Sequence, residues 1–352
     1  MKYLLSKLLM VAMMFVATGC SAASYVHMID VNQDGDGGHG DAYLIRSGGK
    51  NCLVDAGQYQ QAKINLVPRL QALGISRLDC FINTHPHADH LQGLKALAEA
   101  NIRIDTYYHN RPPLSVDDWA YIHAEHDELV GAHIAQGMKM VRLAAGDSVD
   151  FGNGVINVIF AHTELKIKGR TTNVNNFSMV FVFEVDGVRT MFTGDVEVAG
   201  GDLVAELPQS KAHIFTTPHH GGLGGSKKLY LGVEAMVHLY SSTKEIFNLL
   251  SSEPIGWTNQ AGAKLCHNGY NGEIIVKLMD GRFQIIPQNP SANCPSVQMD
   301  APDMKVPPMK KNLAFLTSIY FLLGVGPFDT PPDHSVQIPG TEIEPADGGE
   351  NE

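Results

Sequence analysis

The sequence predicts an α/β fold. Between residues 25 and 298, short apolar segments typical of strands alternate with turns and with longer segments of helical periodicity. Potential metal-binding side chains directly follow several of the apolar segments. The 352 residues are 44% hydrophobic and 18% charged, which is the composition of a globular protein with a large core. Neither a repeat nor a change of composition interrupts this part, so we expect one domain over residues 21–298.

The apolar runs predict the individual elements. Strands are expected at 25–31, 42–46, 51–55, 80–84, 155–160, 179–185, 190–192, 212–216, 236–239 and 273–279. Helices are expected at 61–73, 92–100, 117–131, 201–207 and 244–251.

The N-terminus resembles an export signal. Lys2 and Lys7 flank the start of an apolar run at 8–16, and small residues then precede Cys20. This order is typical of a bacterial lipoprotein signal, so we expect residues 1–20 to be removed and Cys20 to carry a lipid. The alternative is ordinary secretory cleavage near residues 22–23. Both predict an exported protein of the cell envelope; the first also predicts a membrane anchor on the periplasmic face or the cell surface.

The C-terminal segment 299–352 has a different composition. Paired prolines and an acidic, glycine-rich end predict disorder. An apolar stretch at 313–323 is short for a membrane span. We expect a helix on the surface of the domain or of a membrane, with a spanning segment as the alternative.

Charge and cysteine content narrow the possible partners. The formal net charge is -11 and there is no Lys/Arg-rich block, so a stable complex with nucleic acid is not expected. A nucleic-acid substrate remains possible because bound metals supply local positive charge. Four cysteines besides Cys20 could pair in an exported protein or remain buried thiols, and the sequence indicates no pairing. They are Cys52, Cys80, Cys266 and Cys294.

The run from Thr84 to His90 contains three histidines and one aspartate between a predicted strand and a predicted helix. Imidazole nitrogen and carboxylate oxygen are ligands that suit zinc or a similar divalent ion. At alternate positions, His85 and His87 can bind one metal. One step on, Asp89 and His90 can reach a second metal.

Three further polar groups follow predicted strands. Asp195 could bridge two metals, His219 and His220 offer another imidazole, and Asp55 could orient a ligand histidine. Taken singly, each motif is ordinary in a turn or on a surface. Their common position at strand ends predicts a site for two metals.

These motifs resemble those of the metallo-β-lactamase superfamily, and more narrowly of the hydrolase domain of ComEC-type competence proteins and secreted phosphorylcholine esterases. The shared features are an Asp-Val-x-Gln…Gly-Asp-Ala opening, a strand ending in Asp-x-Gly, the His-x-His-x-Asp-His signature, Asn-x-Ser, Thr-Gly-Asp and His-His-Gly. They lie at 30–42, 55–57, 85–90, 176–178, 193–195 and 219–221.

The resemblance implies a four-layer αββα sandwich with two divalent metals, zinc or else manganese, at one edge. His85, His87 and Asp195 would hold one metal. The other would be held by Asp89, His90, Asp195 and one of His219 or His220, with His219 preferred because it is nearer the strand end.

Two departures from the family pattern concern the site: the lack of a third histidine for the first metal, and Gly222, which stands where the family usually has Ser after His-His-Gly. Many members supply a third histidine to the first metal, but residues 172–178 contain none, and His162 is the nearby candidate. An insertion at 34–39 splits the opening motif. We expect it to form a glycine-rich loop at the mouth of the site, where His39 and Asp41 could touch substrate.

Two metals at close range would lower the pKa of a bridging water and make hydroxide available. Asp89 would orient this nucleophile, and His220 would protonate the leaving group if His219 binds metal. With export, the resemblance implies hydrolysis of phosphodiesters, either nucleic acid or an envelope ester. The alternatives are another hydrolase of this fold, acting on a lactone or β-lactam, and a non-catalytic metal-binding lipoprotein.

Overall fold

The computed structural model describes residues 22–32, 39–112, 120–161, 174–222 and 224–309, and for 166–167 and 170–171 the backbone alone. The signal segment with Cys20, the insertion up to residue 38, His162 and the tail from residue 310 lie outside the described residues. The chain divides into two compact units, Met1–Lys311 and Asn312–Glu352, and the account below concerns the first.

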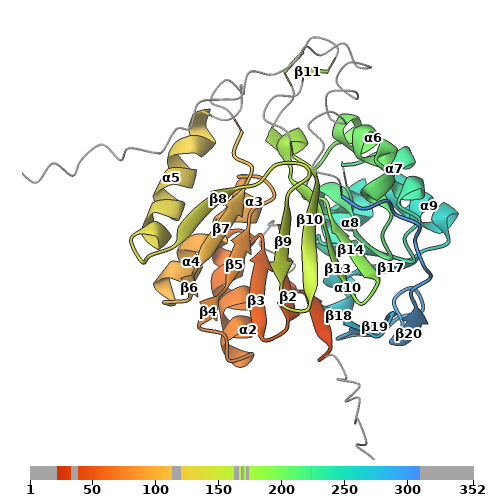
Figure 1. Ribbon diagram of the computed structural model, residues 1–352, viewed down its shortest axis with the longest axis horizontal. Coiled ribbons are helices and arrows are strands. Elements are labelled where there is room, and N and C mark those ends of the chain that lie inside the picture. Colours follow the sequence, from red (N-terminus) through yellow and green to blue (C-terminus); the bar gives the residue numbers. More distant parts are fainter. Residues whose placement is uncertain are drawn as a thin grey trace, which may run out of the picture. The chain divides into compact units, whose positions relative to one another are not determined.

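Two large mixed sheets form the centre of this unit (Figure 1). The first has nine strands in the order β20 (Val297–Asp300), β19 (Arg282–Pro287), β18 (Ile274–Met279), β1 (Ser24–Met28), β2 (Tyr43–Ser47), β3 (Lys50–Val54), β5 (Cys80–Ile82), β7 (Thr106–His109) and β8 (Lys139–Arg142). The second has seven, in the order β17 (Lys264–His267), β16 (Val237–Tyr240), β15 (Ile214–Thr216), β14 (Val188–Phe192), β13 (Val180–Val185), β10 (Gly154–Phe160) and β9 (Ser148–Phe151). Two short pairs complete the strands, β4 (Arg77–Leu78) with β6 (Arg103–Ile104) and β11 (Lys166–Ile167) with β12 (Arg170–Thr171).

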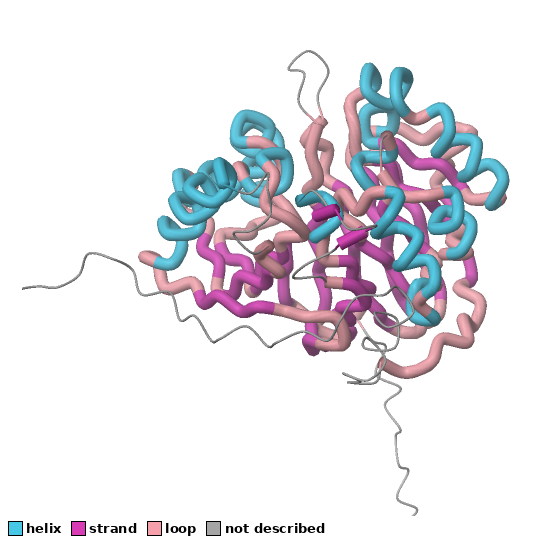
Figure 2. The backbone as a smooth tube through the Cα atoms, turned by 90° about the horizontal axis from the view of Figure 1, so that it is seen from above, coloured by secondary structure: helices cyan, strands magenta, loops and turns pink. Residues whose placement is uncertain are grey.

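Helices cover the outer face of each sheet (Figures 1 and 2). On the first sheet lie α1 (Tyr59–Gln61), a π-helical segment (Ala62–Leu66), α2 (Val67–Ala72), α3 (Ala88–Leu91), α4 (Gly93–Glu99) and α5 (Ala120–Ile134). On the second lie α6 (Val198–Glu206), α7 (Lys227–Gly232), α8 (Lys244–Leu250) and α9 (Ser252–Ala261), and α10 (Asn268–Asn271) follows β17. Short 3-10 turns stand at Val174–Phe177, Pro208–Ser210 and Pro218–Gly221. The predicted four-layer αββα sandwich is therefore confirmed.

Hydrophobic side chains fill the spaces between the layers, and two large clusters stand out among the described residues. Side chains of both sheets, among them Phe181 and Val276, form the core between the sheets. The other core packs β3 and β5 against the helices on the first sheet, and includes Leu53, Phe81 and Leu94. The strand β13 contributes to the inter-sheet core and is buried along nearly its whole length, which explains its continuous apolar run.

Every predicted strand and helix overlaps an observed element, with ends displaced by a few residues. The expected helix 61–73 is a series of α1, the π-helical segment and α2, and it ends at Gly74, whose φ of +73° suits glycine. The predicted elements do not include β7, β8, β9 and β17, which are short and carry charged or histidine residues. They also do not include the hairpin formed by β19 with β20, or the helices α7 and α9. Every helix in the described part of the chain is too short or too polar to traverse a lipid bilayer.

The four cysteines of the domain form two disulfides, Cys52–Cys80 and Cys266–Cys294. Cys52 and Cys80 are direct neighbours on the parallel strands β3 and β5. The other bridge joins β17 to the segment that precedes β20. The sequence had left these pairings open.

Parallel pairing places the metal-binding motifs at one edge. In the first sheet β3, β5 and β7 run parallel, and in the second β14, β15 and β16 do so. The carboxyl ends of parallel strands meet at the same edge of a sheet, which is the usual position of a ligand site in α/β proteins. Asp55, His85, Asp195 and the two adjacent histidines all follow such ends.

Candidate metal centre

The loop after β5 and the first turn of α3 carry four of the predicted ligands. His85 is fully buried at the loop, and its Nε2 lies 3.0 Å from Nδ1 of His87. Asp89 and His90 stand on α3. The backbone amide of Leu91 donates to the His87 carbonyl oxygen, so the loop passes directly into the helix.

Asp195 lies between the imidazoles. Its Oδ2 is 3.6 Å from Nε2 of His85, of His219 and of His220, and its Oδ1 is 3.1 Å from Nε2 of His90. The preceding Gly194 has φ +52° and packs so closely on Thr84 that a Cβ would lie 2.7 Å from the Thr84 side chain.

The Asn-x-Ser motif fixes the backbone on both sides of Asp195 by hydrogen bonds. The amide of Asp195 donates to Oγ of Ser178 over 3.0 Å. Asn176 Oδ1 accepts from the amides of Glu197 and Gly200, at the start of α6. This explains why asparagine and serine occur together before β13.

The histidine pair sits in an unusual turn. His219 and His220 both have left-handed backbone angles, with φ of +51° and +60°, which cost energy for residues other than glycine. The turn directs the two rings differently. The His220 side chain is 2% exposed and its Nε2 lies 3.0 Å from Asp89 Oδ2, whereas the His219 side chain is 21% exposed.

Two buried carboxylates fix the orientation of the inner imidazoles. Asp55 Oδ2 lies 2.8 Å from Nδ1 of His90, and Asp41 Oδ1 lies 3.2 Å from Nδ1 of His220. In both rings Nε2 is thereby directed at the other acids, as in metal sites where a carboxylate orients the ligand histidine. Sequence reasoning anticipated this role for Asp55 but placed Asp41 near substrate; only the tertiary contact reveals its partner.

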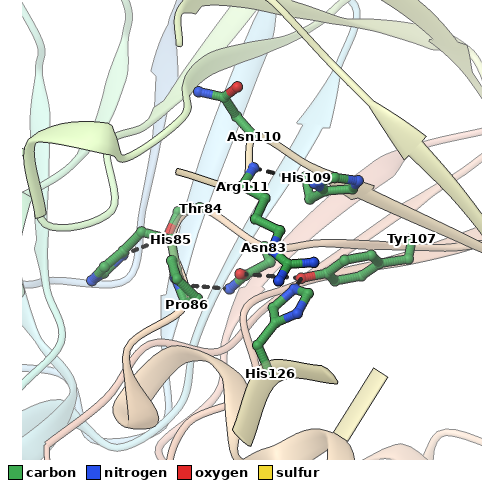
Figure 3. Close-up of a pocket in the computed structure, with 9 residues that line it drawn as sticks. All are labelled: Asn83, Thr84, His85, Pro86, Tyr107, His109, Asn110, Arg111 and His126. Carbon is green, nitrogen blue, oxygen red and sulfur yellow. Dashed lines mark hydrogen bonds between the residues drawn. The ribbon is translucent and has the colours of Figure 1, made fainter. Parts of the chain in front are cut away.

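A chain of hydrogen bonds connects the centre with α5 (Figure 3). Asn83 donates to Asp55 over 3.0 Å and accepts from the Tyr107 hydroxyl over 3.3 Å. The same hydroxyl lies 3.1 Å from His126 Nε2, and His126 Nδ1 is 3.2 Å from Asp127. The chain of contacts thus runs from the half-exposed Asp127 to His90. Nothing in the sequence spacing signals Tyr107 or His126.

The acids dominate the electrostatics. Burial alone would lower the pKa of His90 and of His220, but surrounding carboxylates, Asp195 foremost, outweigh it and raise both pKa values well above the ordinary range. Burial favours a protonated Asp195, yet the imidazoles, His90 first, hold its pKa well below the usual range. For His85 burial prevails and lowers the pKa, with His90 contributing. In the absence of metal, the buried Asp195 carboxylate is therefore balanced by positive charge on neighbouring imidazoles, a role that a divalent cation can take over.

Divalent ions fit this arrangement. Among the described residues, His90 Nε2 and Asp195 Oδ1 are buried and face each other without an acceptable hydrogen bond. Ligand atoms lie within 4.8 Å of one another in three groups: Asp41, His90, Asp195 and His220; His39, Asp89 and His220; and His85, His87 and Asp195. Nitrogen and oxygen donors of this kind suit zinc and manganese alike.

A comparison with protein families supports this interpretation. The family model of the metallo-β-lactamase superfamily matches residues 35–234, which is more than half of the chain. The chain belongs to the metallo-β-lactamase superfamily. It is accordingly a hydrolase of the metallo-β-lactamase fold, from a superfamily of generally metal-dependent enzymes.

Relatives support the ComEC-type resemblance. The chain is 23% identical over 237 residues to ComE operon protein 3 of Bacillus subtilis, which covers 62% of this chain and 28% of that protein. It is 34% identical over 64 residues to competence protein ComA of Neisseria gonorrhoeae, covering 18% of this chain and 9% of that protein. The chain thus matches only a minor part of either relative. A solved metallo-β-lactamase fold protein, YhfI from Bacillus subtilis, is 14% identical with a TM-score of 0.47, covering 70% of this chain and 96% of that one.

Proposed function

We propose that this metallo-β-lactamase-fold protein is an exported hydrolase of phosphodiesters that uses two divalent metal ions. The observation that carries the proposal is the position of Asp195, which belongs to two of the three groups of potential ligands. A carboxylate shared in this way is suited to bridge two ions. When bound, the ions would lower the pKa of coordinated water and stabilise negative charge that develops on an ester oxygen.

The roles of the side chains follow from their contacts. His85 and His87 with Asp195 would hold the first metal, and Asp89, His90 and His220 with Asp195 the second. We assign the ligand role to His220 rather than to His219, because His220 is buried, is oriented by Asp41 and contacts Asp89.

This assignment leaves His219 to protonate the leaving group, which reverses the roles expected from sequence. The His219 side chain is the more exposed of the pair and still lies 3.6 Å from Asp195 Oδ2. Asp89 would both bind metal and orient the attacking water, because its Oδ2 contacts His220 while 15% of its side chain is exposed.

Phosphodiesters are the favoured substrates for two reasons. Pairs of metal ions are common in enzymes that displace groups at phosphorus, where they stabilise both the attacking and the leaving oxygen. The resemblance of the motifs to ComEC-type proteins implies the same class. The net charge of -11 argues for a small or envelope-associated ester over a stable complex with long nucleic acid.

Export is supported by the disulfides. Such bridges persist in oxidising compartments and are rare in the cytosol. Together with the signal-like N-terminus, they support a mature protein in the cell envelope, anchored by a lipid on Cys20. Mass spectrometry of membrane-derived protein would detect the lipid, and Cys20→Ser would release the protein from the membrane.

The activity is tested with bis-(p-nitrophenyl) phosphate and metal analysis on the same mature protein. We expect about two metals per chain, and turnover that falls by at least about 100-fold in His87→Ala and in Asp195→Asn. His27→Gln is a matched control, because His27 lies on β1 and pairs with Glu273 outside the centre. Undiminished turnover in both variants would refute the proposal.

The alternatives give distinct results in the same experiment. Hydrolysis of a lactone or a β-lactam without phosphodiester turnover would identify another activity of this fold. Weak metal retention with no turnover of any ester would favour a non-catalytic metal-binding lipoprotein.

A further inference from the structure

His39 lies inside the centre although it comes from the insertion that splits the opening motif. Its Nε2 is 3.2 Å from Asp89 Oδ2, and its ring meets the His220 ring edge to face, with centroids 4.6 Å apart. Its Nδ1 is buried and, among the described residues, has no hydrogen-bond partner. The side chain itself is 32% exposed, so it forms the solvent side of the centre.

The backbone beside His39 is firmly held. The amide of Gly40 donates to Asn32 Oδ1, and the Gly40 carbonyl oxygen accepts from Asn32 Nδ2 and from Ser241 Oγ. The next amide, of Asp41, donates to the Asp89 carbonyl oxygen over 3.2 Å. These bonds join the two residues after His39 to the loop after β1, to the loop after β16 and to α3, so the position of His39 next to Asp89 is built into the fold.

Glycine at position 40 is required by the same contact. A Cβ there would lie 2.5 Å from the carbonyl oxygen of Asp89. The chain therefore passes too close to the backbone of α3 for any other side chain at position 40, and this brings the side chain of His39 next to the Asp89 carboxylate.

Three imidazoles converge on one carboxylate oxygen. Besides His39 at 3.2 Å, Nε2 of His220 lies 3.0 Å and Nε2 of His90 lies 4.0 Å from Asp89 Oδ2. The three rings come from separate segments of the chain. In His90 and His220, Nδ1 contacts a buried carboxylate. Nitrogen atoms gathered around an acid in this way form a donor set for a divalent cation.

We propose that His39 is an additional ligand of the metal held by Asp89, His90 and His220. This inference rests on the proposed function, since it requires a metal at the second site. The second metal then has three imidazoles available, whereas the first has His85 and His87. The second site should accordingly retain its metal more tightly than the first, because His39, the last residue of the insertion, adds a ligand to it.

The test measures metal binding in the absence of substrate. The mature protein is stripped with a chelator and titrated with Zn²⁺ against a chromophoric competitor, and with Co²⁺ while its visible absorption is recorded. We expect two binding steps for the wild type. In His39→Ala the affinity of the tighter step falls by at least about tenfold and its Co²⁺ bands change, while the weaker step is unaffected. His27→Gln serves as the control.

The outcomes separate this inference from the proposed function. Two metals bound by the wild type, with unchanged affinity and spectrum in His39→Ala, would overturn the role of His39 alone. Unchanged metal affinity and spectrum in His39→Ala together with lost phosphodiester turnover would also overturn the ligand role, and would indicate that His39 contacts substrate. A wild type that binds no metal would overturn both proposals.

A measurement on the wild type covers the case in which His39→Ala does not fold. Long-range ¹H–¹⁵N spectra of the histidine rings, recorded with and without Zn²⁺, report directly on each ligand nitrogen. We expect the Nε2 resonance of His39 to shift with those of His90 and His220. An unchanged His39 chemical shift on addition of Zn²⁺, while those of His90 and His220 change, would contradict the proposal.

Discussion

Replacing Asp55 by asparagine should weaken the second metal site through the tautomer of His90. Asp55 accepts four hydrogen bonds. Oδ1 receives those from the Thr84 amide (2.9 Å) and Asn83 (3.0 Å), and Oδ2 receives the Thr84 hydroxyl (2.6 Å) and contacts His90 Nδ1 (2.8 Å). In Asp55→Asn one oxygen can keep the first pair, and the new amide nitrogen then faces the second pair. His90 must accept at Nδ1 and carry its proton on Nε2, the atom that faces Asp195.

The magnitude follows from this change. Loss of a carboxylate that orients a ligand histidine typically costs about 10–100-fold in metal affinity, or about 1.4–2.7 kcal/mol. The free energy of unfolding of the metal-free protein should fall by about 2–3 kcal/mol, because two hydrogen bonds to a buried carboxylate are replaced by weaker ones to a neutral amide.

Chelator competition measures the affinity, and urea unfolding with excess chelator measures the stability. Asp79→Asn is the matched control, since Asp79 also accepts a backbone amide, from Asn51 over 2.9 Å, but contacts no histidine of the centre. Equal affinity of Asp55→Asn and wild type for both metals would refute the tautomer argument.

Three further predictions concern stability. Tyr107→Phe should lower the free energy of unfolding in urea by about 2–4 kcal/mol, because it removes the hydroxyl that contacts buried Asn83 and His126. Tyr108→Phe on the same strand is the control and should lower it by less than about 0.5 kcal/mol. Similar values for both variants would contradict the chain of contacts to α5. Removing Cys266 and Cys294 together should destabilise the protein by about 3–4 kcal/mol, from the entropy of a loop of 28 residues, and no change in the thermal midpoint would disprove it. Burial lowers the pKa of His238 to about 3, so between pH 3 and 6.5 the unfolded state binds a proton that the folded state does not. The free energy of unfolding should therefore fall with decreasing pH, by up to about 1.4 kcal/mol per pH unit. His238→Asn should reduce this slope in urea titrations at about pH 5 and 7, and an unchanged slope would contradict the prediction.

The residue pattern predicted an α/β fold and most of the centre because both depend on local order along the chain, whereas the four-layer sandwich was implied by the resemblance to the metallo-β-lactamase superfamily. Apolar runs mark buried strands, and polar residues at their carboxyl ends meet at one edge. The five residues His85, His87, Asp89, His90 and Asp195 were found in this way, and the structure brings them together.

The remaining features depend on contacts between distant segments. Asp41 faces His220 across 179 positions, and Tyr107 reaches Asn83 across 24, so neither leaves a periodic signal. The choice between His219 and His220 depends on a left-handed turn that directs neighbouring rings differently, and no spacing rule distinguishes them. Four cysteines allow three pairings, which only the register of the strands resolves.

The bridge between Cys52 and Cys80 has a consequence for the assembly of the centre. The two cysteines stand just before Asp55 and just before the histidine loop, on adjacent strands. When the two cysteines are oxidised, the crossover between them becomes a closed covalent ring. The distance between Asp55 and His85 is then limited even in an unfolded chain. A metal-free protein that unfolds with this bridge intact therefore keeps part of the binding site preassembled, and binding of metal starts from a much smaller set of conformations than in the reduced chain.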